Sequence, residues 1–72
     1  MKRFDPAALY RALDAQRSSR GMSWAEVSRE IGVSVATLKR TSEGGRMEVD
    51  GVLAMVGWLG VAVERFVRAS SR

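Results

Sequence analysis

Two adjacent cations, Lys39 and Arg40, stand near the end of a short segment, EIGVSVATLKR, that contains a single glycine. That glycine, Gly32, predicts a sharp break between two short helices, because it adopts the positive-φ backbone that other residues resist. Ser34 then predicts the N-cap of a new helix over 34–42. A cationic helix of this kind has the chemistry to contact phosphates and to donate hydrogen bonds to the edge of a guanine.

The rest of the side-chain inventory excludes most catalytic chemistry. The chain has no cysteine and no histidine. Disulfides, thiolate nucleophiles and thiolate metal sites are therefore absent, as are the usual general base and the commonest metal ligand. A carboxylate-based enzyme is a remote alternative, since no paired acids support it. We expect a protein that is not an enzyme and that needs no metal or cofactor.

The charge distribution suits a polyanionic partner. The chain has 72 residues and a net charge of +4. Nine of its 12 Lys and Arg residues and five of its eight Asp and Glu residues lie within residues 1–46, so that segment alone accounts for the net charge. Residues 47–72 are balanced. Such asymmetry favours nucleic acid as a partner, although basic surfaces are also common in small domains with no such partner.

Local signals predict an all-α fold in a single domain over residues 1–72. Asp5 followed by Pro6 is typical of a helix start, and Ser23 with Glu26 three residues later forms a capping box. A short chain like this one must use every apolar face in its core. We find no strand pattern, and we expect five short helices, at about 6–19, 23–32, 34–42, 49–59 and 62–69.

The predicted corner at Gly32 fixes which side of the following helix is free. Ile31 and Val33 flank the glycine and can both point inward against Leu38, as in a helix-turn-helix. The opposite side of that helix then stays open to solvent, and it carries Ser34, Val35, Ala36, Lys39 and Arg40.

A stretch of about 46 residues, from Met22 to Val67, resembles the helix-turn-helix domain of Cro and phage-repressor-like regulators, the lambda-repressor-like XRE family. The likeness rests on small Ser28, the IGV corner, inward Leu38, Gly44 and the LGV of residues 59–61. It implies a helix-turn-helix core over about 23–42 and C-terminal helices over about 49–69. It also implies a sequence-specific regulator, usually a dimeric repressor, that reads the major groove of double-stranded DNA with helix 34–42.

The resemblance also implies residue roles. The family's base-reading positions match Ser34, Val35, Ala36 and Arg40, with Arg40 positioned to bridge two acceptors of a guanine and the two apolar residues to contact thymine methyl groups. Its phosphate-contacting positions, together with nearby cations, give the set Trp24, Thr37, Lys39, Arg46 and Arg17. Trp24 departs from the family, which often has glutamine there, and packing of its indole over neighbouring helices is an equal alternative.

The C-terminal third has apolar residues on more than one helical face, which favours a partner. We expect a two-fold homodimer, with Trp58, Val63, Phe66 and Val67 at its interface. The rival interpretation is a protein-interaction adaptor, of an antitoxin or antirepressor-like kind, on the same scaffold. The sequence has no apolar run of membrane-spanning length and no signal-peptide pattern, so we expect a cytoplasmic, nucleoid-associated protein with no membrane partner.

Overall fold

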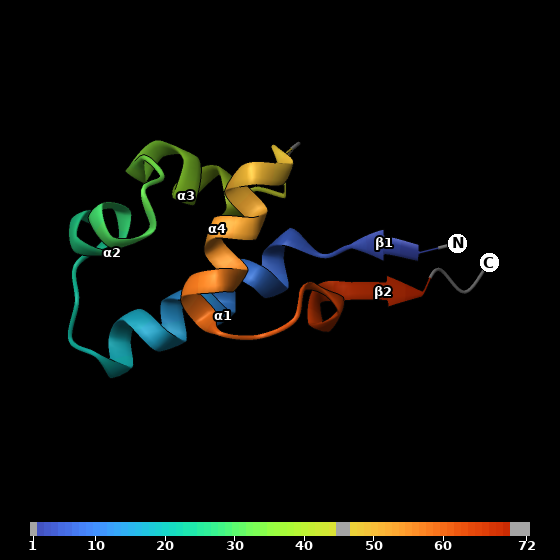
Figure 1. Ribbon diagram of the computed structural model, residues 1–72, viewed down its shortest axis with the longest axis horizontal. Coiled ribbons are helices and arrows are strands. Elements are labelled where there is room, and N and C mark those ends of the chain that lie inside the picture. The colour runs from blue at the N-terminus through green and yellow to red at the C-terminus, as the bar shows by residue number, and fades with distance from the viewer. Residues whose placement is uncertain (1, 45–46, 70–72) are drawn as a thin grey trace.

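The computed structural model describes residues 2–44 and 47–69. Within these ranges the chain is mostly helical, and a small two-stranded sheet joins its two ends (Figure 1). The elements, in chain order, are strand β1 (Lys2–Phe4), helices α1 (Pro6–Ser19), α2 (Trp24–Ile31), α3 (Val35–Ser42) and α4 (Val49–Leu59), the 3-10 turn η1 (Val63–Phe66) and strand β2 (Val67–Ala69).

The predicted helix starts are confirmed by their caps. An oxygen of the Asp5 carboxylate accepts a hydrogen bond from the backbone N–H of Ala8 at 3.1 Å, and Pro6 opens α1. Ser23 and Glu26 form both hydrogen bonds of the capping box ahead of α2. Ser34 likewise caps α3. Side chains that satisfy the free N–H groups of a first turn make these boundaries local properties of the sequence.

The core lies where α1 meets the other helices. Leu9 and Leu13, one turn apart on α1, are both fully buried. Each remaining helix and η1 adds at least one buried apolar side chain; these are Val27, Leu38, Met55, Val56 and Phe66. A domain of this size has one core, so loss of any of these side chains removes a large share of its packing.

The prediction of a fifth helix over 62–69 is wrong, as is that of a chain without strands. Residues 63–66 form the single turn η1, and β2 follows it directly. β2 pairs antiparallel with β1, with Phe4 opposite Val67. The backbone N–H of Asp5 donates to the carbonyl of Phe66 at 2.7 Å, which holds the junction. The aliphatic and aromatic residues here suit a strand once a partner strand supplies its hydrogen bonds.

The capping box makes the stability of α2 dependent on pH. Hydrogen bonds from the backbone and side chain of Ser23 lower the pKa of Glu26 below its ordinary value. A lowered pKa in the folded state stabilises the fold above the ordinary value and loses that contribution as the pH falls through the folded value. We expect the urea concentration at the midpoint of unfolding to fall as the pH drops below about 4.5, the ordinary pKa of this carboxyl. Glu26→Gln, which can still accept the same hydrogen bond, should remove this part of the pH dependence, and an unchanged pH profile in that variant would contradict the assignment.

None of the helices in residues 2–44 and 47–69 combines the length and the apolar character needed to cross a membrane.

Candidate nucleic-acid interface

The connection between α2 and α3 is a hydrogen-bonded corner. Gly32 has φ of 84°, in the left-handed region, as its place in the sequence predicts. The hydroxyl of Ser28 donates to the carbonyl of Val33 at 2.6 Å, and the N–H groups of Gly32 and Val33 both donate to the carbonyl of Ser28. The small Ser28 side chain therefore ties the last turn of α2 to the residue before the α3 cap, which restrains the direction of α3.

One side of α3 is packed against the body of the protein. Leu38 is 1% exposed and Thr41 is fully buried. The Thr41 hydroxyl lies 3.1 Å from the carbonyl of Thr37 and 3.8 Å from the sulfur of Met55 on α4. Because its polar atom has an acceptor within its own helix, Thr41 can occupy the core without an unsatisfied hydroxyl.

The opposite side of α3 is open to solvent, as predicted. The residues exposed there are Ser34, Val35, Ala36, Lys39 and Arg40. Val35 is 44% exposed, one of three large apolar side chains that are exposed among the described residues. The exposed side thus combines two cations with two small apolar side chains, and the first-turn N–H groups of Val35 and Ala36 lie before the first backbone hydrogen bonds of the helix.

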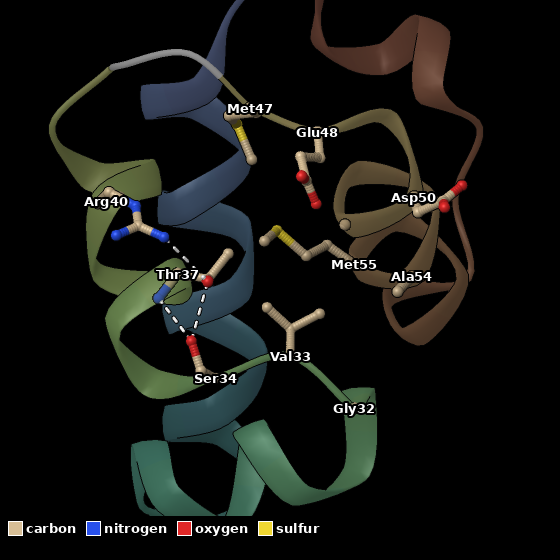
Figure 2. A pocket seen from close by; sticks show the side chains of 11 residues that line it. Gly32, Val33, Ser34, Thr37, Arg40, Met47, Glu48, Asp50, Ala54 and Met55 are labelled. Carbon is tan, nitrogen blue, oxygen red and sulfur yellow. Dashed lines mark hydrogen bonds between the residues drawn. The ribbon is translucent and has the colours of Figure 1, made fainter.

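Three of the expected contact residues form a row along α3, shown in Figure 2. The Ser34 hydroxyl accepts from the N–H of Thr37 at 3.1 Å and lies 2.9 Å from the Thr37 hydroxyl. A terminal nitrogen of the Arg40 guanidinium donates to that same hydroxyl at 3.3 Å. This row holds the Arg40 head against its own helix while leaving the residue exposed.

The row lines one wall of a groove of about 490 Å³ between α3 and the start of α4. Met47, Glu48, Asp50 and Met55 line the facing side (Figure 2). The Glu48 carboxylate points into the groove across from Arg40, whereas the Asp50 carboxylate points away from it (Figure 2). The sequence of α3 alone does not show this carboxylate, because Glu48 is the residue that precedes α4.

Two of the expected phosphate contacts, Arg17 and Trp24, take part in an internal cluster. The Arg17 guanidinium donates to the Asp14 carboxylate at 2.6 and 3.0 Å and to the carbonyl of Met22 at 2.9 Å. It also lies 5.0 Å from the centre of the Trp24 ring. Trp24 stacks on Tyr10 of α1, with ring centres 5.1 Å apart. The cluster fastens the first turn of α2 to α1.

Trp58, expected at a dimer interface, makes three contacts within the chain. Its indole N–H donates to a carboxylate oxygen of Glu30 on α2 at 2.8 Å. The Arg20 guanidinium lies 5.2 Å from the ring centre, and the Gln16 amide donates to the Trp58 carbonyl at 3.1 Å. The residue therefore joins the end of α4 to α1 and α2, although its side chain is only partly buried.

The other expected interface residues also differ in accessibility. Phe66 is only 4% exposed and belongs to the core, so it has almost no surface to offer a partner, while Val63 and Val67 are half-buried. Large apolar exposure lies elsewhere on α4, at Val49 (71%) and Leu53 (53%). In the sequence, this exposure was indicated by apolar residues on more than one face of α4. Arg46, expected to contact phosphate, lies outside the described residues.

No protein-family model, curated protein or solved structure matches this chain. The functional argument therefore depends on the geometry of α3 and its surroundings.

Proposed function

We propose that α2 and α3 form a helix-turn-helix of the Cro and phage-repressor-like type, and that α3 lies in the major groove of double-stranded DNA. One observation carries the proposal. α3 is packed on the side of Leu38 and Thr41, and its other side, with Lys39 and Arg40, is open to solvent beside a hydrogen-bonded corner. The major groove, about 12 Å wide, accepts an α-helix presented in this way.

The exposed side chains suit distinct parts of a duplex. The Arg40 guanidinium can donate two hydrogen bonds to O6 and N7 of one guanine, and it need only leave its 3.3 Å contact with Thr37 to do so. Val35 and Ala36 offer the apolar contact that thymine methyl groups favour. Lys39 and the free N–H groups at the start of α3 suit phosphates. Together these contacts would provide both sequence preference and affinity.

The same proposal makes the protein a transcriptional regulator that acts by occupying its site rather than by chemistry. We propose that it binds as a homodimer and represses. The exposed Val49 and Leu53 of α4 support a protein contact, because one chain of this size leaves them in solvent. Two-fold symmetry would place two copies of α3 about 34 Å apart, one turn of DNA.

A protein-interaction adaptor is the second candidate. The exposure of Val35, Val49 and Leu53 favours it, since a groove-binding helix does not require the latter two. An adaptor of the antitoxin or antirepressor-like kind would use these apolar side chains to hold another protein. The two candidates differ in how binding to DNA responds to salt, because a phosphate-dominated contact releases counterions and an apolar one does not.

Selection of bound sequences from a random duplex pool tests the proposal. We expect enrichment of a palindrome, which would report both the target and the two-fold symmetry. With about six phosphate contacts, affinity should fall about 10³-fold between 50 and 200 mM salt. A pool that stays unenriched, with weak binding that hardly responds to salt, would reject the DNA proposal and favour the adaptor.

A further inference from the structure

The two-stranded sheet places two arginines directly opposite each other. In the register of β1 and β2, Arg3 pairs with Arg68. Residues opposite each other in an antiparallel pair lie on the same face, with Cα atoms about 4.5–5.5 Å apart. The next pair, Phe4 and Val67, must lie on the other face, since successive side chains alternate.

The arginine face is the outward one. Phe4 packs against the core, so the face that it shares with Val67 is turned toward the helices. Arg3 is exposed, and the Arg68 side chain is 52% exposed. Figure 1 shows the two strands side by side, extending away from the helices.

This pairing is electrostatically unfavourable for the isolated chain. Like charges directly opposite in a sheet destabilise it, and neither strand contains an acidic residue. Among the described residues, the Asp5 carboxylate is the acid that reaches the pair, 3.5 Å from the Arg68 guanidinium. The other oxygen of Asp5 caps α1. One carboxylate near Arg68 cannot neutralise two guanidinium groups, so the face keeps a net positive charge.

We propose that this outward face, defined by Arg3 and Arg68 and called here the ribbon face, binds the phosphate backbone of DNA. The inference deepens the function proposed above and rests on it, and it adds a second contact surface to α3. Guanidinium groups bind phosphate oxygens with two parallel hydrogen bonds. A phosphate between the two arginines also removes their repulsion. DNA binding therefore recovers the free energy that this repulsion costs the folded protein.

A duplex fits the ribbon face better than an anionic membrane does. Protein segments that bind to membrane surfaces combine cations with apolar side chains that enter the bilayer. The apolar residues of this ribbon, Phe4 and Val67, belong to the inward face instead. A purely cationic, exposed face matches a partner that offers charge alone, which is the DNA backbone.

Arg3→Glu separates a binding role from an ordinary surface charge. The substitution converts a like-charge pair into an opposite-charge pair, so we expect Tm to rise by about 2–5 °C. Affinity for random duplex DNA at about 100 mM salt should nevertheless fall at least tenfold. Arg29→Glu, on the exposed surface of α2, makes the same change in net charge and should weaken binding much less. Equal losses of DNA affinity in the two variants would overturn the assignment of the ribbon face as a binding surface.

The double variant Arg3→Gln with Arg68→Gln provides a second readout. Removal of two phosphate contacts should lower the salt slope of binding by about 1.8 per protomer, with preference for the selected site unchanged. A thermal melt checks that the variant is folded.

Three outcomes, from these DNA titrations and from a parallel titration with lipid vesicles, decide the inference. An unchanged slope in a folded double variant overturns the ribbon face and leaves the role of α3 intact. If the unsubstituted protein binds no duplex at about 50 mM salt, both proposals fail. If the double variant keeps its affinity for duplex but loses binding to vesicles containing phosphatidylserine, the ribbon face is a membrane site and the inference is rejected.

Discussion

Arg40→Ala is expected to lower sharply the preference for the selected site over random duplex DNA. Loss of a bidentate arginine–guanine contact removes about 1–3 kcal/mol of discrimination, which is a factor of about 5–150 in relative affinity. The affinity for random duplex DNA should fall much less, because the substitution removes only one cation. Competition titrations of the selected site against a scrambled duplex, at one fixed salt concentration, measure the ratio directly.

Lys39→Ala is the matched control for this prediction, because Lys39 is the neighbouring cation and is also exposed. As a phosphate contact it should weaken binding to both duplexes by the same factor and lower the salt slope by about 1. Neither exposed side chain contributes to the core, so both variants should unfold within about 0.5 kcal/mol of the parent. If Arg40→Ala also lowered the affinity for both duplexes by the same factor, Arg40 would be a phosphate contact and not a base reader.

Leu38→Ala should destabilise the whole protein and not only its site. Leu38 is 1% exposed and is the buried apolar anchor of α3. Truncation of a buried leucine costs about 2–5 kcal/mol, from lost transfer free energy and the cavity left behind. A domain of this length has a total stability of about 4–11 kcal/mol, so the variant loses a large share of it. Urea unfolding followed by circular dichroism should show a much lower midpoint, with DNA binding reduced in proportion to the unfolded fraction.

Val35→Ala controls for the loss of an aliphatic side chain on the same helix. Val35 is 44% exposed, so its truncation should change the free energy of unfolding by no more than about 0.5 kcal/mol. It should instead alter binding at a thymine-containing position of the selected site. Similar destabilisation by the two substitutions would mean that both sides of α3 are packed, and the proposal that α3 enters a groove would fail with that result.

The sequence by itself determined the helical framework, because its signals act within a few residues. Asp5, Ser23 and Ser34 satisfy the N–H groups of the turns that they precede. Gly32 marks the corner, since its φ of 84° strongly favours a residue without a side chain. The exposed side of α3 also followed from the sequence, once Leu38 was assigned to the core by its spacing from the corner.

Only the tertiary structure decided the features that join distant segments. β2 exists because β1, more than 60 residues earlier in the chain, supplies its hydrogen bonds, and the local apolar pattern alone had indicated a helix. Arg17 and Trp24 carry the chemistry of phosphate contacts, and the fold also gives them partners within the chain, the Met22 carbonyl for Arg17 and the Tyr10 ring for Trp24. The opposition of Arg3 and Arg68 is likewise a property of strand register. Pairing between the two ends of a chain leaves no periodic trace in either end, so only the folded molecule brings those charges together.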